Sequence, residues 1–87
     1  MKIKDEYVLE RIADKWVVVS ANAGSLNFNK IISFNDSAAF LWQRIEDGNQ
    51  RDELVKSLME EYDIDITKAK EDVDKFIEQL NSLEVFV

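Results

Sequence analysis

Apolar and polar residues alternate with a period of two in the N-terminal part of the chain, which is typical of β-strands. Residues 7–13 form one such segment, and residues 16–20, which are aromatic and β-branched, form a second. If Asp14-Lys15 is a two-residue turn, Ile12 faces Val17 and Glu10 faces Val19. The hairpin then carries Val8, Ile12, Val17 and Val19 on one face, and Leu9, Arg11, Trp16 and Val18 on the other. We expect one of these faces to pack on helices.

Residues 26–28 and 31–34 are two further apolar segments, separated by Asn29-Lys30. Asn accepts the left-handed conformation of a tight hairpin turn, so one interpretation is a turn at Asn29-Lys30. The other interpretation is a continuous strand over residues 26–34. Both leave Ile31–Phe34 as the last strand of a short antiparallel sheet, after a loop or bulge at residues 21–25.

After Phe34 the apolar period changes from two to about 3.6, which predicts helices. Asn35 or Asp36 is the predicted cap of a first helix that ends at Gly48. A second helix starts near Asn49 with Glu53 as a capping residue, and Asp65 caps the third. The apolar stripes of the three helices are Ala38, Ala39, Leu41, Trp42 and Ile45; Leu54, Val55, Leu58, Met59 and Tyr62; and Ile66, Ala69, Val73, Phe76, Ile77, Leu80 and Leu83. The tail, residues 84–87, is apolar enough to dock on the body.

The predicted order is three strands over residues 7–34 and three helices over residues 36–83. This is an α+β fold with a winged helix-turn-helix-like arrangement. The 87 residues, 46% of them apolar, are enough for one domain, residues 1–87. Residues 1–6 lack the apolar segment of a signal peptide, and no apolar segment reaches the roughly 18 residues that a membrane span needs. We therefore expect a cytoplasmic protein with no membrane partner.

Candidate chemistry is sparse because the chain contains no Cys and no His. It lacks thiolate nucleophiles and thiolate metal ligands, and it lacks the commonest general base. The densest acidic segment, residues 60–65, has neither the central Gly nor the ligand spacing of an EF-hand loop. We expect no catalytic residues, no metal and no cofactor, and therefore a protein that is not an enzyme.

The charge of the chain disfavours nucleic acid as a partner. Asp and Glu number 18 against 11 Lys and Arg, for a net charge of −7. Nucleic acids are bound through Lys and Arg that neutralise phosphates, so such a surface is repelled. Acidic residues also outnumber basic ones on the predicted third helix, which disfavours it as a reader of the DNA major groove.

A short sheet ends in an edge strand, and a free edge accepts a strand from another chain. Ile31–Phe34 is the candidate edge, and the third helix beside it would form one side of a groove. A guest strand would be held by main-chain hydrogen bonds and selected by side-chain pockets. We expect Ile32→Pro to weaken its capture by removing a backbone donor. The same edge can pair with a second copy, so a homodimer is possible.

Residues 31–42 resemble the PqqD-like family of precursor-peptide recognition domains, which serve ribosomally synthesised, post-translationally modified peptides. Phe34-Asn35 stands for the family's Leu-Asn, Ala38 or Ala39 for its small residue, and Trp42 for its Trp. The acidic segment at residues 60–63, Asp72-Val73 and the Leu-rich end add to the likeness, which extends from about Tyr7 onward. Lys30 and Ala38 depart from the pattern, since many relatives have Gly at both places.

The resemblance implies a stand-alone, non-catalytic domain that binds the leader segment of a precursor peptide as an added strand. It implies a separate modifying enzyme as partner, such as a radical S-adenosylmethionine maturase, an ATP-dependent ligase or a protease, and no cofactor in the domain itself. Val73 and Ile77 are expected in the core by their place in the stripe. The alternative is an interaction or regulatory subunit of the same fold that binds a folded protein. The peptide-binding residues that the resemblance implies are Ile31, Ile32, Ser33, Phe34, Asp72, Lys75, Phe76, Gln79, Leu80 and Leu83.

Overall fold

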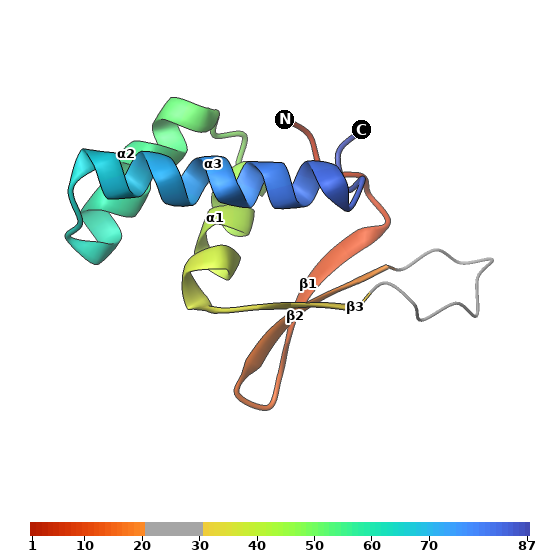
Figure 1. The fold of residues 1–87 in the computed structure, drawn as a ribbon. Helices are drawn as coiled ribbons and strands as arrows, with labels where there is room; N and C mark the ends of the chain where they lie inside the picture. The colour runs from red at the N-terminus through yellow and green to blue at the C-terminus, as the bar shows by residue number, and fades with distance from the viewer. Residues whose placement is uncertain (21–30) are drawn as a thin grey trace.

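The structure is a computed structural model that describes residues 1–20 and 31–87. Three strands, β1 (Tyr7–Ile12), β2 (Lys15–Ser20) and β3 (Ile31–Phe34), precede three helices, α1 (Asp36–Glu46), α2 (Arg51–Tyr62) and α3 (Ile66–Ser82) (Figure 1). The strands form one antiparallel sheet in the order β1-β2-β3. The predicted α+β fold is confirmed, and its element order agrees with a winged helix-turn-helix-like arrangement. The predictions for residues 21–30, including the turn or continuous strand at Asn29-Lys30, lie outside the described residues.

The predicted turn at Asp14-Lys15 is wrong by one residue. The turn is Ala13-Asp14, so Ile12 pairs with Lys15, and the whole register moves by two residues. A shift of two leaves every side chain on its predicted face, because side chains alternate along a strand.

The physical reason for this register lies in the partner of Val18, which is fully buried. In the predicted register Val18 would lie opposite Arg11, a charged residue. In the observed register it lies opposite Leu9. Arg11 instead lies opposite Trp16, where its guanidinium stacks over the indole ring at 5.4 Å from the ring centroid.

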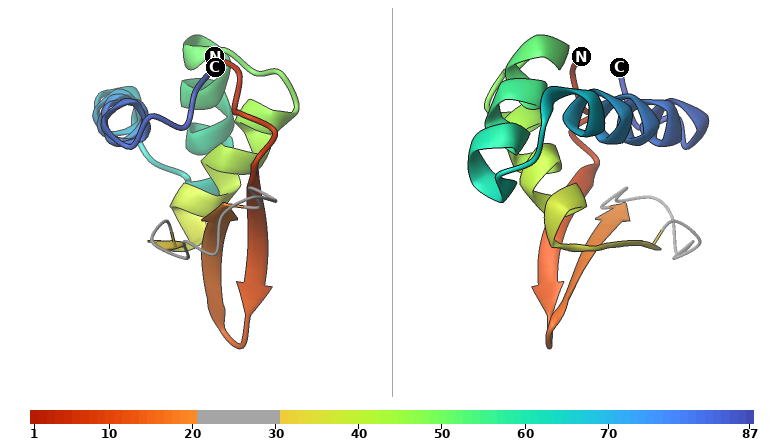
Figure 2. Two further views of the ribbon diagram at one scale, coloured as in Figure 1. Left: turned by 90° about the vertical axis from the view of Figure 1, so that its right-hand side faces the viewer. Right: turned by 60° about the vertical axis from the view of Figure 1, so that its left-hand side comes forward.

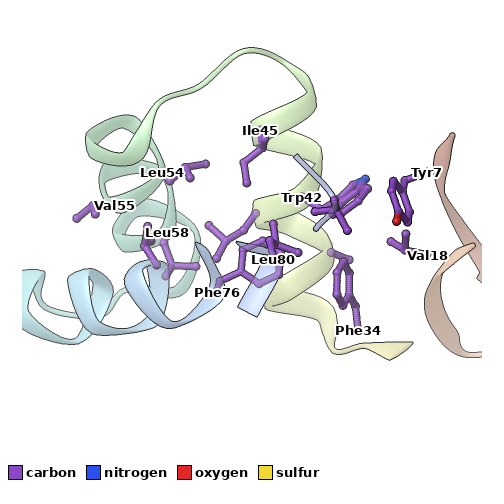
Figure 3. Close-up of a cluster of buried hydrophobic side chains, with 14 of the residues drawn as sticks. Tyr7, Val18, Phe34, Trp42, Ile45, Leu54, Val55, Leu58, Phe76 and Leu80 are labelled. Atoms are coloured by element: carbon purple, nitrogen blue, oxygen red, sulfur yellow. The ribbon is translucent and has the colours of Figure 1, made fainter. Parts of the chain in front are cut away.

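Trp42 of α1 lies at the centre of the core with no exposed surface. The sheet supplies Tyr7, Val18 and Phe34 to this core, and Figure 3 shows them gathered beside Trp42. The rings of Phe34 and Trp42 are 5.6 Å apart and tilted by 58°. The helices close the core from the other side with Ala39, Leu41, Ile45, Leu54, Val55, Leu58, Ala69, Val73, Phe76 and Leu80.

The helices start at side-chain caps. The Asn35 side chain accepts the Ala38 N–H at 2.8 Å, which decides between the two predicted caps of α1. Glu53 accepts the Gln50 N–H at 2.9 Å, and Asp65 accepts the Lys68 N–H at 2.8 Å, as predicted for both. α2 begins at Arg51, two residues after the predicted start.

The C-terminal tail docks as predicted. Val85 is fully buried, and the tail pairs with the N-terminal segment through an antiparallel bridge between Ile3 and Phe86. The Lys4 N–H donates to the Val85 carbonyl, and the Val87 N–H donates to the Lys2 carbonyl, both at 2.8 Å. The two ends of the chain therefore lie side by side near the end of α3 (Figures 1 and 2). None of the described helices is long and apolar enough to cross a membrane.

Ala13→Gly is expected to stabilise the fold. Ala13 has φ of 56°, and the first residue of such a two-residue turn is normally Gly. Relief of this strain, less the larger chain entropy of Gly, predicts a gain of about 0.5–1 kcal/mol in the free energy of unfolding. Urea denaturation measures it, and Asp14→Gly is the control because Asp14 has no positive φ. An unchanged or lower midpoint for Ala13→Gly contradicts the turn geometry.

Candidate functional site

β3 is an edge strand of the described sheet. β2 pairs with both of its neighbours, whereas β3 pairs with β2 alone among residues 1–20 and 31–87. The other side of β3 therefore presents backbone N–H and C=O groups that need a partner.

The hairpin determines which backbone groups of β2 face β3. A two-residue turn is closed by a hydrogen-bonded pair, here Ile12 and Lys15. Bonded and non-bonded pairs alternate along antiparallel strands, so every second residue of β2 from Lys15 onward bonds to β1. Trp16 and Val18 lie between these residues and therefore bond to β3.

The free edge of β3 follows from this alternation. The partners of Trp16 and Val18 are Phe34 and Ile32, whose backbone groups thus point to β2. The N–H and C=O groups of Ile31 and Ser33 point the opposite way, to the free edge. Ile32→Pro would therefore remove a hydrogen bond within the sheet, and Ser33→Pro is the variant that removes a donor from the free edge.

The side chains of β3 alternate in the same way. Ile32 and Phe34 lie on the face that carries Val18 and packs on the helices, and Phe34 is 7% exposed. Ser33 is exposed on the opposite face. β3 thus offers free backbone hydrogen-bonding groups at Ile31 and Ser33, and apolar side chains at Ile32 and Phe34.

An aromatic contact joins the end of β3 to α3. The rings of Phe34 and Phe76 are 5.4 Å apart at an angle of 67°, an edge-to-face arrangement. Phe34 contacts Trp42 of α1 as well. The contact with Phe76 brings α3 alongside the sheet at the residue where β3 ends.

A pocket of about 280 Å³, which we call the inner hollow, opens beyond this contact between the start of α1 and α3. Its apolar lining comes from all three helices and its polar rim from α3 and the residues around the α1 cap. The apolar residues are Ala38, Leu41, Leu58 and Phe76, and the polar residues are Asn35, Ser37, Asp72, Lys75 and Gln79.

A second pocket of about 420 Å³, the outer hollow, adjoins the first. The two share Asn35, Ser37, Leu58 and Asp72, and the outer hollow adds Asp36, Tyr62 and Ile64. We call the two hollows together the groove.

The outer end of the groove carries acidic side chains, Asp36 and Asp72. Asp72 accepts a hydrogen bond from the Lys68 Nζ at 3.0 Å, and this contact raises the pKa of Lys68. Burial raises the pKa of the Tyr62 phenol, and the negative charges of Asp36 and Glu61 raise it further. Both charges increase the negative potential around the phenol.

Four of the predicted site residues, Asp72, Lys75, Phe76 and Gln79, line the inner hollow. Leu80 is fully buried in the core beneath the helix surface, and Leu83 is partly buried against the core. Val73 is in the core as predicted, and Ile77 is partly buried against it. The described lining of the two hollows contains none of the predicted β3 residues; β3 ends at Phe34, directly before Asn35, which lines both hollows.

Sequence reasoning missed the contribution of α1 and α2 to the groove. Ser37, Leu41 and Leu58 line it, although the apolar pattern marked both Leu residues only as core. The pair Asn35-Asp36 was the one sequence signal for this part of the groove, because polar residues at the start of α1 lie directly after the end of β3. No group of three or more acidic residues that could hold a metal ion occurs among the described residues.

Comparison with known proteins gives a family and two similar structures. The family model described as coenzyme PQQ synthesis protein D (PqqD) matches residues 15–85. TbiB1, solved in complex with the TbiA(beta) leader peptide, has a TM-score of 0.77 and 25% identity, over 98% of this chain and 93% of that one. Lasso peptide synthetase B1, complexed with the leader peptide, is similar in fold, with a TM-score of 0.73 and 22% identity over 93% and 89%. No curated protein matches the chain.

Asp36→Asn is expected to lower the pKa of Tyr62, because it removes one of the charges that disfavour the phenolate. The pKa should stay above the ordinary value, since burial is the larger cause. Titration of ¹³C-labelled Tyr by NMR measures it. Asp52→Asn, at the other end of α2, removes the same charge without affecting Tyr62. Equal shifts in the two variants would contradict the proximity of Asp36 to the phenol.

Proposed function

The chain belongs to the PqqD family, as its resemblance at residues 31–42 predicted, and on this premise we propose that it binds the leader segment of a precursor peptide. It presents this segment to a separate modifying enzyme. The two similar structures support this function, because TbiB1 and lasso peptide synthetase B1 are both complexed with leader peptides.

The observation that carries the proposal is the free edge of β3 next to the groove. A guest strand pairs with Ile31 and Ser33 through its backbone, as peptides do when they extend a sheet. The guest residues opposite Ile32 and Phe34 turn their side chains toward α3, because directly opposite residues share a face. Guest side chains between them turn to the other face of the sheet.

The predicted helical residues have different roles in this proposal. Phe76 forms part of the apolar lining of the groove, and Asp72, Lys75 and Gln79 offer charged and amide groups at its rim. Leu80 and Leu83 support the helix from behind, in agreement with their burial. They act on peptide binding through the position of α3.

The domain itself is non-catalytic and carries no cofactor in this proposal. Its sequence supplies no His or Cys for acid–base or nucleophilic chemistry. Residues 1–87 act as one recognition domain in the cytoplasm. The modification is made by a partner enzyme, for example a radical S-adenosylmethionine maturase, an ATP-dependent ligase or a protease.

A second copy of the chain is a competitor for the same edge. Pairing of two β3 strands would give a homodimer whose groove is closed to the leader, so peptide binding would dissociate it. A regulatory subunit that binds a folded protein is the other function compatible with this fold. Binding of a peptide alone separates the proposed function from this alternative.

Strand addition predicts an alternating response to N-methylation of the peptide. The probe is a peptide selected for binding to this chain from a library of random 12-residue peptides. Methylation opposite Ile31 and Ser33 removes a hydrogen bond and is expected to weaken binding about tenfold. Methylation opposite Ile32 and Phe34 is tolerated, while Ala substitution there weakens binding. Titration calorimetry measures the series, and an effect without a period of two would exclude strand addition.

Ser33→Pro is expected to weaken leader binding about tenfold while the sheet stays folded, because the lost N–H faces the free edge. Ser33→Ala keeps this N–H and should bind as the unchanged protein does. Ile32→Pro should instead lower the stability of the sheet, since its N–H bonds to β2. Circular dichroism checks folding and calorimetry checks affinity. A folded Ser33→Pro variant with unchanged affinity rules out the edge as the binding site.

A further inference from the structure

The outer hollow continues the groove away from the end of β3. It shares four lining residues with the inner hollow, so a chain that occupies the inner hollow passes directly into the outer one. The two hollows differ in chemistry, and this difference bears on which leaders the groove accepts. The following inference rests on the proposed function.

The inner hollow suits one large apolar side chain. Leu41, Leu58 and Phe76 give it an apolar part beside five polar lining residues, and its volume of about 280 Å³ accommodates an aromatic or long aliphatic group. Its two charged residues, Asp72 and Lys75, have opposite signs. The inner hollow therefore gives no preference for the sign of a charge.

The outer hollow has a different balance. Its described lining includes the carboxylates of Asp36 and Asp72 and neither Lys nor Arg. Asp36 forms no ion pair among the described residues. Asp72 is paired with Lys68, but this pair is weak because the Lys68 ammonium group is exposed to solvent. Burial is the larger cause of the raised pKa of Tyr62, and the negative charge of Asp36 raises it further.

The Tyr62 ring lines the outer hollow and is held by an aromatic contact. It packs edge-to-face on Phe40 of α1, with ring centroids 6.0 Å apart at 88°. The ring and its phenol oxygen, together with the two carboxylates, offer hydrogen-bond acceptors and an aromatic surface. A guanidinium or ammonium group uses all of these.

The order in which guest residues meet the hollows follows from the direction of an added antiparallel strand and from the position of the hollows. Both lie beyond Phe34, at the C-terminal end of β3. A guest that extends this antiparallel sheet in the same sense runs opposite to β3, so its N-terminal part reaches the hollows. The residue in the outer hollow then precedes the residue in the inner one.

We propose that the outer hollow selects leaders with a Lys or Arg on the N-terminal side of an apolar anchor. The anchor enters the inner hollow, and the basic side chain lies between Asp36 and Asp72. The substrate class is therefore a leader whose recognised segment begins with a basic residue followed by a large apolar one.

Peptide display tests the proposal without a known leader. A library of random 12-residue peptides is selected on the full chain and on two double variants. Asp36→Asn/Asp72→Asn removes the two charges of the outer hollow. Glu71→Gln/Glu78→Gln removes two charges from exposed positions of α3 that line neither hollow, and so matches the change in net charge.

The unchanged chain and the Glu71→Gln/Glu78→Gln control should enrich Lys or Arg N-terminal to an aromatic or aliphatic residue. The Asp36→Asn/Asp72→Asn variant should enrich the apolar residue alone. Replacement of the basic residue by Gln in a selected peptide should weaken binding about fivefold at low salt and less at high salt. This replacement should have no effect on the Asp36→Asn/Asp72→Asn variant.

Two outcomes overturn the inference and are separate from failure of the proposed function. Enrichment of apolar anchors without a basic neighbour leaves peptide capture intact and removes the charge preference. Enrichment of a basic residue on the C-terminal side reverses the direction of the guest. If the selection yields no peptide that binds better to the unchanged chain than to Ser33→Pro, leader capture at β3 itself fails.

Discussion

The contacts of Phe34 determine where the groove lies. Its ring packs against both Trp42 of α1 and Phe76 of α3, so one side chain joins the sheet to two helices. The next residue, Asn35, caps α1 with its side chain. A strand end, a helix start and the side of α3 are thus fixed together over two consecutive residues. The free edge of β3 ends at Phe34, and the lining of the hollows starts at Asn35. Both therefore take their positions from this junction.

The faces of the sheet and the periods of the helices were predictable from the sequence, whereas the register of the hairpin was not. Periodicity assigns a residue to a face, and a shift by two residues leaves that assignment intact. The register depended on long-range packing, which placed Leu9 rather than Arg11 opposite the buried Val18. The register also decides which backbone groups of β3 are free. The N–H that faces the free edge is that of Ser33 and not that of Ile32.

The residues of the groove were predictable on α3 and largely not on α1 and α2. A stripe at helical spacing marks Leu41 and Leu58 as apolar and buried, but does not tell which of their atoms border a hollow. Which atoms border a hollow depends on how the three helices pack together, and no local sequence pattern encodes this packing. Leu80 shows the converse: its neighbours line the groove, yet the turn of the helix directs its own side chain into the core.

If a leader binds by the strand addition proposed above, the alternation along β3 limits how much of its sequence the domain can specify. Residues that bond to Ile31 and Ser33 are held by groups that every amino acid except proline shares, so their identity is almost free. Only the intervening residues meet the groove, and these carry the information that distinguishes one leader from another. In this binding mode about half of the contacted segment would be free to change by mutation without loss of recognition, and precursor peptides could diverge while they remain substrates of the same pathway.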